Sequence, residues 1–514
     1  MDSRPIDMPP ARRGTITEPS IGCRVLDAIV EHALRQPNAA ALVRVTSDWE
    51  VSRRITYSQL VRAVSLLEAQ ICATVEPEGT VVLIGHNSPD FVAWFLAVLA
   101  AGRRVFPFHP LLASPEVCNL AAQSGAVAMI ATPEHHLKVG SNLISLNLTR
   151  VPWDEATQTD HTPKLSQGGG LVLQSSGTTG APRIVFRGRE ALDSVAAAVG
   201  EAMALAADDR VIAAIPLCHS YGVDILLATL LAGASLHIHE KFDPQLIASE
   251  CSTGVDAVFP GVPFMFDALS RLRPDCGSGA SSLRLAVSAG GPLPQRINDA
   301  MFSSWGIRVG QIYGATELGS VTMSDPASRL YDASSVGLPL RGSSVRILAP
   351  DNLNRCLPRN EEGHVAVCTP SMLSAYVPSG APELVDGHLP IGDLGRLDEQ
   401  GRLFITGRTK LLIDSGGVKI SPIEVELALA QHPGVRECVV GPLALSDTVV
   451  RLRAVFVAVD PSNPPSEGEL RRHMKALLAP YKVPRVFEQV EALPRSPAGK
   501  ILRSTALREG PSTC

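Results

Sequence analysis

Short apolar runs alternate with amphipathic helical patterns through most of this 514-residue chain, and this alternation predicts its fold class. The predicted strands are 80–84, 127–130, 171–173, 211–215 and 283–288. Buried strands that alternate with helices are typical of proteins in which helices cover a largely parallel sheet. We therefore expect an α/β fold made of layered subdomains.

One helix can be placed from its end signals. Ser88 is a suitable N-cap, Pro89 fits the first helical position, and Gly102 follows the last turn. The apolar residues between them recur at the spacing of one helical face, and they are Phe91, Trp94, Phe95, Val98 and Leu99. We expect this helix to belong to the core and to carry no chemistry.

Composition excludes several classes of protein. A hydrophobic fraction of 45% argues against disorder, and a net charge of −5 argues against a general nucleic-acid binder. The ten cysteines include no CxxC pair and no Cys/His cluster, so we expect neither a zinc site nor a disulfide framework, and a reducing, cytoplasmic location. The polar N-terminus predicts no secretory signal. The longest apolar run, 91–101, is shorter than the ~20 residues of a membrane span.

The last hundred residues have a pattern of their own. Residues 421–424 and 466–469 both match a capping box that opens a helix, and 435–440 and 454–459 have the composition of strands. This predicts a small α+β domain with its own core. We place its boundary near 408–410.

The segment from Ser175 to Arg183, which reads SSGTTGAPR, follows a predicted strand. Its glycines allow backbone N–H groups to approach phosphate oxygens, its hydroxyls add donors, and Arg183 adds charge. Because it lacks the GxxxxGK[ST] pattern, a P-loop kinase or GTPase is a poor interpretation. A flexible turn is the alternative for this loop taken alone.

Three further segments could contact a nucleotide. Tyr313 could stack on a base, Thr316 could donate to a phosphate, and Glu317 could hold Mg²⁺. Asp393 could accept ribose hydroxyls, with an Asx-turn as the alternative. A single lysine, Lys500, lies on a Pro/Gly-rich loop, where a lone lysine is usually a solvated surface residue.

Taken together and in this order, these segments resemble the adenylate-forming superfamily of acyl-CoA synthetases, adenylation domains and luciferases. The resemblance extends over about residues 25 to 505. The matching segments are SSGTTGAPR (175–183), PLCHSYG (216–222), SAGGPLP (288–294), YGATE (313–317), VGLPL (336–340), IGDLG (391–395), GRTKLLIDSGGVKISPIEVE (407–426) and PRSPAGK (494–500).

The resemblance implies that the chain activates a hydrophobic carboxylic acid with ATP and Mg²⁺ to acyl-AMP, and then forms a thioester with CoA. Two enzymatic alternatives stay open: a stand-alone ligase that loads the phosphopantetheine of an acyl-carrier protein, and an enzyme that performs one half-reaction. No carrier domain follows residue 505, so a carrier would act in trans. A non-catalytic nucleotide- or acyl-binding protein is a third alternative, and the oligomeric state is open, a homodimer included.

The resemblance also implies a role for each matching residue. The residues implied to contact phosphates are Ser176, Gly177, Thr178, Thr179, Gly180, Arg183 and Thr316, and Glu317 is implied to bind Mg²⁺. The residues implied to contact adenine are Gly290, Gly291, Tyr313 and Gly314. Asp393 and Arg408 would contact the ribose, and Lys500 would contact the reacting carboxylate. His219 is placed at the wall of the acyl pocket, with a packed histidine as the alternative.

The resemblance further implies that the small C-terminal domain is mobile. It would consist of 411–514, follow a hinge at 408–410 that contains Lys410, and leave 1–407 as the large N-terminal domain. One orientation would bring in Lys500, and the other would bring in Gly417 and Lys419 to line a pantetheine tunnel.

The chain departs from the family pattern at four positions. It has Arg183 where lysine is usual, Ile184 for glycine, Ile391 for threonine and Asp414 for lysine. The first two affect the phosphate loop, so ATP affinity or its Mg²⁺ dependence could differ.

The acid pocket is expected to be apolar. Ser220 stands where activators of α-amino acids carry aspartate, so a free α-amino acid is disfavoured because its ammonium would lack a partner. By alignment the pocket would be lined by Cys218, Tyr221, Gly222, Val262, Phe264 and Met265. This lining favours a fatty or aryl acid.

Overall fold

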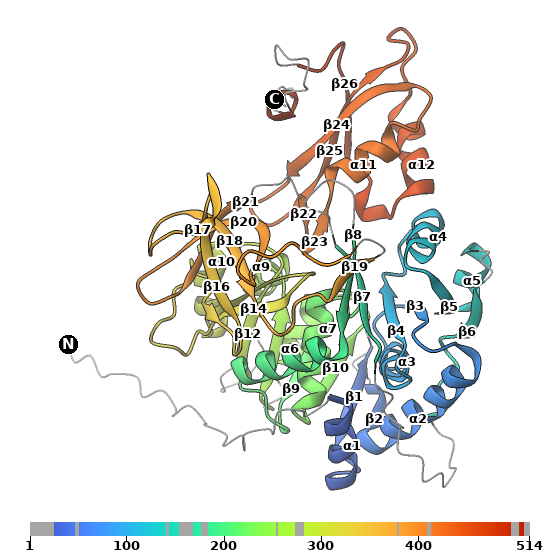
Figure 1. The fold of residues 1–514 in the computed structure, drawn as a ribbon, viewed down its shortest axis with the longest axis vertical. Coiled ribbons are helices and arrows are strands. Elements are labelled where there is room, and N and C mark those ends of the chain that lie inside the picture. The colour runs from blue at the N-terminus through green and yellow to red at the C-terminus, as the bar shows by residue number, and fades with distance from the viewer. Residues whose placement is uncertain are drawn as a thin grey trace.

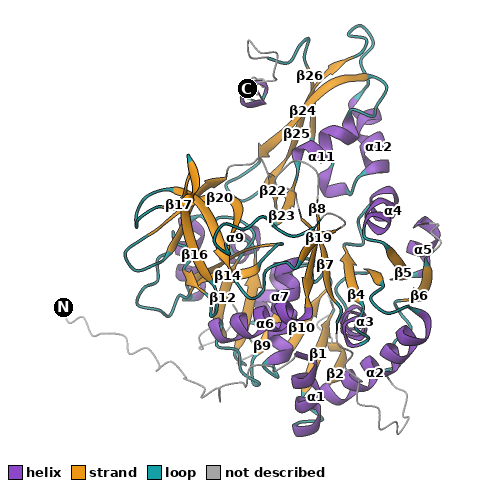
Figure 2. Ribbon diagram, viewed as in Figure 1, coloured by secondary structure: helices purple, strands orange, loops and turns teal. Residues whose placement is uncertain are grey.

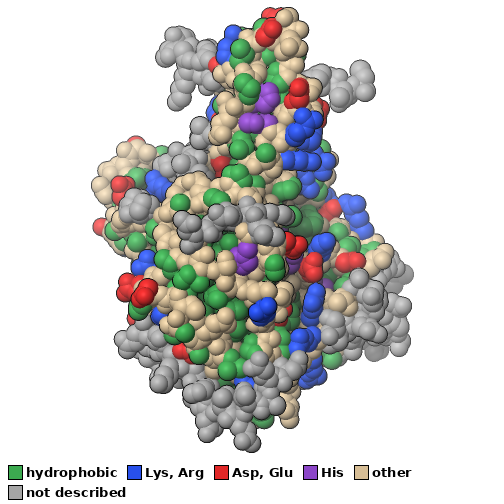
Figure 3. Space-filling model, turned by 90° about the vertical axis from the view of Figure 1, so that its right-hand side faces the viewer, with side chains coloured by type: hydrophobic (Ala, Val, Ile, Leu, Met, Phe, Trp, Pro, Cys, Tyr) green, Lys and Arg blue, Asp and Glu red, His purple; other side chains and the backbone are tan. Residues whose placement is uncertain are grey.

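The computed structural model describes residues 25–46, 51–139, 143–153, 168–175, 183–252, 255–272, 282–377, 380–408, 413–494 and 503–507. It is a mixed α/β structure, as predicted, with a large N-terminal part and a small C-terminal unit above it in Figure 1. Figure 3 shows the C-terminal unit as a narrower projection, with basic and acidic side chains interspersed on the visible face.

Two large sheets form the N-terminal part. The first sheet has the order β15 (Leu338–Pro339), β14 (Gly319–Ser324), β13 (Val309–Ala315), β12 (Leu283–Ser288), β11 (Ala257–Gly261), β9 (Arg210–Ala213), β10 (Ser235–His239), β1 (Ala40–Val45), β2 (Val51–Thr56). The second has the order β19 (Ala375–Val377), β8 (Arg183–Gly188), β7 (Gly170–Ser175), β4 (Arg104–Phe108), β3 (Thr80–Ile84), β5 (Ala126–Ala131), β6 (Ile144–Asn147). Central strands pair in parallel, and antiparallel pairs lie toward the edges.

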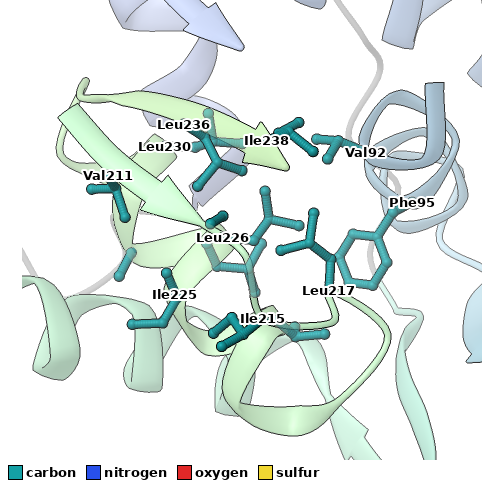
Figure 4. Packing of buried hydrophobic residues seen from close by; sticks show 14 of the residues in the cluster. Val92, Phe95, Val211, Ile215, Leu217, Ile225, Leu226, Leu230, Leu236 and Ile238 are labelled. Carbon is teal, nitrogen blue, oxygen red and sulfur yellow. The ribbon is translucent and has the colours of Figure 1, made fainter. Parts of the chain in front are cut away.

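A layer of helices lies between the two sheets (Figure 2). It contains α1 (Val25–Arg35), α2 (Tyr57–Thr74), α3 (Pro89–Ala100), α6 (Arg189–Ala202) and α7 (Ser220–Leu231). Helix α3 contacts β3 and β4 on one side and β1 on the other, and α6 contacts β7, β8 and β14. Figure 4 shows Val92 of α3 beside Ile238 of β10, and Phe95 of α3 beside Leu217. Both sheets therefore share one apolar core.

Other helices cover the outer faces of the large sheets. They are α4 (Ser114–Gln123) and α5 (Pro133–Val139) beside β5, and α8 (Pro244–Glu250), α9 (Pro263–Ser270) and α10 (Gln295–Trp305). A third sheet, which supplies part of the site, has the order β17 (Asn352–Cys356), β16 (Ser344–Ala349), β18 (Gly363–Cys368), β20 (Leu389–Leu397), β21 (Leu403–Arg408).

The C-terminal unit has a separate apolar core. Its elements are the hairpin β22 (Ile413–Ser415) and β23 (Val418–Ile420), helix α11 (Pro422–Leu429), β24 (Val435–Ala444), β25 (Val450–Ala458), α12 (Glu467–Leu477), the short 3-10 helix η1 (Pro480–Lys482), β26 (Val486–Gln489) and α13 (Arg503–Ala506). The capping box at Ser466 is confirmed, since Ser466 accepts from the Glu469 N–H. The one at Ser421 is wrong, because this side chain makes no capping hydrogen bond although it precedes the helix.

The predicted strands are confirmed, with small shifts at their ends, and so is the helix that begins after Ser88. Ser88 Oγ accepts from the Phe91 N–H at 3.1 Å. The helix is buried on all sides and not only on the predicted face, because sheets and helices surround it. Within the described residues, no helix is both long and apolar enough to cross a membrane.

Truncation of Trp94 tests whether the helical layer holds the two sheets together. Trp94 is fully buried in α3, and its indole N–H donates to the Leu148 carbonyl at 3.0 Å. We expect Trp94→Ala to lower the free energy of unfolding by about 3–5 kcal/mol, because it leaves a cavity and an unpaired carbonyl. Urea denaturation followed by circular dichroism measures this, and Leu34→Ala, at an exposed position, serves as the control.

Candidate active site

A large cavity opens where the two large sheets, the third sheet and the C-terminal unit meet. Its volume is about 250 Å³. Segments that follow the carboxyl ends of parallel strands form much of its wall: 106–109 at β4, 218–221 after β9, 289–290 after β12, and 314–317 at the end of β13. This is the edge at which open α/β sheets bind their ligands.

The cavity brings together eight of the residues predicted from the sequence. The eight residues are His219, Gly290, Gly314, Thr316, Glu317, Asp393, Gly417 and Lys419. Segments more than two hundred positions apart in the chain thus share one wall.

The nucleotide-binding candidates Thr316 and Glu317 directly follow β13, and Asp393 lies in the middle of β20. Tyr313, on β13, donates its hydroxyl hydrogen to Asp393 Oδ2 at 2.6 Å, so this pair joins the first sheet to β20. Burial raises the pKa of the Glu317 carboxyl, and the nearby Arg183 guanidinium offsets part of that rise. A partly desolvated carboxylate of this kind gains from binding a cation.

Arg183 lies where the phosphate loop ends. It begins β8 and pairs in register with Ser175, the last residue of β7, and its guanidinium lies 5.1 Å from the centre of the Tyr376 ring. The loop between these strands is outside the described residues, and so are Ser176, Gly177, Thr178, Thr179, Gly180, Lys410 and Lys500. Arg408 is described at its backbone only, where it pairs in register with Asp393.

The hairpin β22–β23 contacts the loop after β12. The Lys419 ammonium donates to the Gly290 carbonyl and to Asp414 Oδ2. A Cβ on Gly290 would lie 3.1 Å from the Gly417 Cα, and Gly290 has a φ of +87°, so only glycine fits comfortably. The departure at Asp414 is thereby explained, since its charge is paired with Lys419.

The candidate acid pocket contains two neutral histidines. The His109 and His219 rings lie 6.2 Å apart at an angle of 17°, and Tyr481 of the C-terminal unit packs edge-on to His109 at 6.0 Å. Burial lowers the pKa of His109 and of His219 to about 4 in each case. His219 precedes α7, whose first turn approaches so closely that a Cβ on Gly222 would lie 2.1 Å from the Pro216 carbonyl oxygen.

A buried ion pair lies beneath the acid pocket. Arg187 Nη1 is 3.3 Å from Asp224 Oδ1 and 3.3 Å from Ser220 Oγ, and Asp224 Oδ2 accepts from the N–H and hydroxyl of Ser320. The two charged side chains are 0% and 1% exposed. The cation that adjoins Ser220 is thus already paired with a carboxylate, and the exclusion of α-amino acids stays a prediction.

The lining of the acid pocket is only partly as predicted. Cys218 and Tyr221 line the cavity, whereas Gly222, Val262, Phe264 and Met265 are not among its lining residues. Sequence reasoning missed several polar or aromatic residues: His109, Asp224, Tyr481, Lys482 and Glu424. His109 follows a buried strand directly, which is the available signal for it; the other residues become part of the site through tertiary packing.

The described residues alone offer too few ligands for Mg²⁺, so a nucleotide would have to supply the others. The described residues contain no cluster of three or more His, Cys, Asp or Glu side chains that could hold a metal ion. Magnesium in such sites takes one or two carboxylates and completes its shell with phosphate and water. Glu317, buried at the cavity wall, is the carboxylate that fits.

We expect Asp224→Asn to lower the free energy of unfolding by about 3–5 kcal/mol, because it leaves the buried Arg187 charge without a counter-ion. Urea denaturation measures the change. Asp386→Asn is the matched control, since Asp386 pairs with Arg346 at the same 3.3 Å but on the surface, and it should cost less than about 1 kcal/mol. Equal effects for the two variants would contradict this account.

The two histidines predict an acid-sensitive fold. Their pKa values are about 4 when folded and about 6.5 when unfolded, so the unfolded chain binds more protons in that interval. Stability should be complete above about pH 6.5 and fall as the pH drops toward 4. The midpoint of thermal unfolding should depend less on pH over this range in His109→Asn/His219→Asn than in the wild type. An unchanged slope would exclude these histidines as the cause.

Comparison with known proteins identifies the family of the chain. The family model described as AMP-binding enzyme matches residues 29–377, and the model of the AMP-binding enzyme C-terminal domain matches residues 424–500. A feruloyl-CoA synthase from Amycolatopsis is 31% identical over 466 residues, which are 88% of this chain and 94% of that protein. The long-chain-fatty-acid–CoA ligase FadD13 of Mycobacterium tuberculosis is 26% identical, with coverages of 93% and 97%.

One solved relative is similar to this chain in two structures with different scores. The o-succinylbenzoate CoA synthetase MenE of Bacillus subtilis, as a double mutant bound with the product analogue OSB-NCoA, has a TM-score of 0.83 at 24% identity, with 94% and 98% of the two chains covered. In complex with the acyl-adenylate OSB-AMP it has a TM-score of 0.66 at 23% identity, with the same coverage. The present arrangement is thus closer to the first structure.

Proposed function

Because the chain belongs to the family of AMP-binding enzymes, we propose that it is an AMP-forming acid–thiol ligase that converts a hydrophobic carboxylic acid to acyl-AMP and then to the CoA thioester. One observation carries this proposal: a single cavity is lined by Glu317 and Asp393, by His219, and by the hairpin residue Lys419. A nucleotide, an acid and a thiol could therefore meet there.

In the first half-reaction a carboxylate oxygen of the acid attacks the α-phosphorus of ATP, the bond to the bridging oxygen breaks, and pyrophosphate leaves. Charge neutralisation and alignment dominate such a step. Thr316 would donate to the α-phosphate, and Asp393, fixed by Tyr313, would hold the ribose. Mg²⁺ bound at Glu317 would supply positive charge to the phosphates. To Lys500 we assign contact with the reacting oxygens.

In the second half-reaction the sulfur of CoA attacks the acyl carbon, the bond from that carbon to the AMP oxygen breaks, and AMP leaves with the electron pair. The thiol proton passes to solvent. Gly417 and Lys419 lie at the cavity wall, and to this wall we assign the contact with the pantetheine arm of CoA. We place the hinge between the two units at 408–410, with Lys410 in it.

We propose an aryl or arylalkenoic acid as the substrate class. The relatives include a feruloyl-CoA synthase and a fatty-acid ligase, but the pocket presents flat rings, from His109, His219 and Tyr481, against which an aromatic acid can stack. A carrier protein as acceptor remains the second candidate. Formation of both thioesters, measured side by side with CoA and with a phosphopantetheinylated carrier, separates the two acceptors.

Exchange of labelled pyrophosphate into ATP tests the first half-reaction. We expect exchange that depends on an added aryl acid, a fall of about 10²-fold or more in Glu317→Gln because a charge that faces the phosphates is lost, and loss of exchange in Lys500→Ala. Glu399→Gln, at an exposed position, should exchange like the wild type. No exchange with any acid of a broad panel, or equal exchange in Lys500→Ala, would refute the proposed function.

A further inference from the structure

A buried ionic contact joins the C-terminal unit to the N-terminal part beside the cavity. The Lys482 ammonium donates to Glu116 Oε1 at 2.6 Å and to Glu424 Oε1 at 2.7 Å. The Lys482 and Glu116 side chains are 6% and 8% exposed. Glu424 lies on α11 of the same unit as Lys482, whereas Glu116 lies on α4. Glu116 is therefore the member that crosses the boundary, where α12 also contacts α4.

The Lys482 ammonium stays charged in this contact. Burial by itself would lower the pKa of the Lys482 ammonium, but Glu424 and Glu116 outweigh it and leave that pKa raised. Burial raises the pKa of the Glu116 carboxyl, and Lys482 opposes this rise. Such a contact is weakly screened by salt and is costly to break from one side, because a buried charge is then left alone.

The contact is close to the C-terminal elements that face the cavity. Tyr481, next to Lys482, packs on His109 at 6.0 Å, and the hairpin residue Lys419 contacts Gly290. Glu116 itself is not among the described residues that line the cavity. Its effect on the site is therefore indirect, and its contact with the C-terminal unit is the one through Lys482.

The nucleotide-side residues do not depend on this contact. The N-terminal part supplies all three of these residues: Thr316 and Glu317 lie in the loop after β13, and Asp393 lies on β20. The chain as a whole is also closer to the relative's structure that holds a CoA product analogue than to the one that holds the acyl-adenylate. The contact between Glu116 and Lys482 thus belongs to the arrangement in which the hairpin lies in the cleft.

We propose that Glu116 is a positioning residue for thioester formation, since it holds Lys482, and with it the C-terminal unit, in the arrangement that places the 416–419 hairpin at the acyl-AMP site. This inference rests on the proposed two-step ligase reaction. It separates the two half-reactions, because only the second one needs the hairpin.

Glu116→Gln tests the proposal with little change of shape. Glu116 Oε2 also accepts from the Ala113 N–H at 3.2 Å, and the glutamine carbonyl can keep that capping bond. We expect acid-dependent pyrophosphate exchange within about twofold of the wild type, and thioester formation from supplied acyl-AMP and CoA to fall about tenfold or more, as befits loss of a buried charge partner. Asp447→Asn is the control, because it breaks an exposed contact across the same boundary, with Arg296 at 2.6 Å, and both rates should stay unchanged.

A second measurement reads the arrangement directly. Arg296→Cys/Asp447→Cys, joined by a short bis-maleimide and detected by mass spectrometry of the linked peptides, reports how often the two surfaces face each other. The yield should fall when Glu116→Gln is added. In a Lys482→Met background, Glu116→Gln should have little further effect on thioester formation, because its partner is already lost.

The outcomes distinguish the failure of this inference from that of the ligase function. Absence of acid-dependent exchange in the wild type would refute the function, and the cross-linking yield would still test the contact. Unchanged thioester formation and cross-linking in Glu116→Gln would overturn the positioning role. A parallel fall of both half-reactions would overturn it as well, because Glu116 would then be a general structural residue.

Discussion

The burial of one apolar helical layer between two sheets is the constraint on which the site depends. Helix α3 offers no polar face, so sheets must cover it on both sides. With both sheets packed on the same layer, the carboxyl ends of β4, β7, β9, β12 and β13 meet at one edge. Loops that are far apart in the chain thereby become neighbours, and each can supply a polar group without disturbing the core.

Much of this arrangement could be predicted from the sequence, for physical reasons that differ between residues. Helix α3 was predictable because Ser88 and Pro89 are local signals. Glu317 and Asp393 were recognised because short motifs around them match a family. Asp224 was missed because it looks like an ordinary polar residue of an apolar helix, and its role depends on Arg187, 37 positions earlier, and Ser320, 96 positions later.

Two buried ion pairs near the cavity illustrate different uses of charge. Arg187 and Asp224 both belong to the N-terminal part. Their attraction therefore stabilises one conformation of the residues beneath the acid pocket. Lys482 and Glu116 come from two parts with separate cores. A buried pair that lies within one core can only open when that core unfolds, whereas a pair across two cores can separate while both remain folded. The pair of Lys482 and Glu116 can therefore stabilise one arrangement of the two units over another, whereas the pair of Arg187 and Asp224 cannot.

This division also explains why the cavity needs both units. The N-terminal part supplies the groups that suit phosphates and ribose, and these are donors and acceptors on β20 and in the loop after β13. The C-terminal unit supplies Gly417, Lys419 and Tyr481, which lie on a hairpin and a short 3-10 helix above the acid pocket. The thiol of CoA must reach the acyl carbon only after ATP has reacted. The cavity wall that we assign to the thiol, Gly417 and Lys419, belongs to the C-terminal unit. The contact of that unit with Glu116 can separate, so this wall can be placed when the second step needs it.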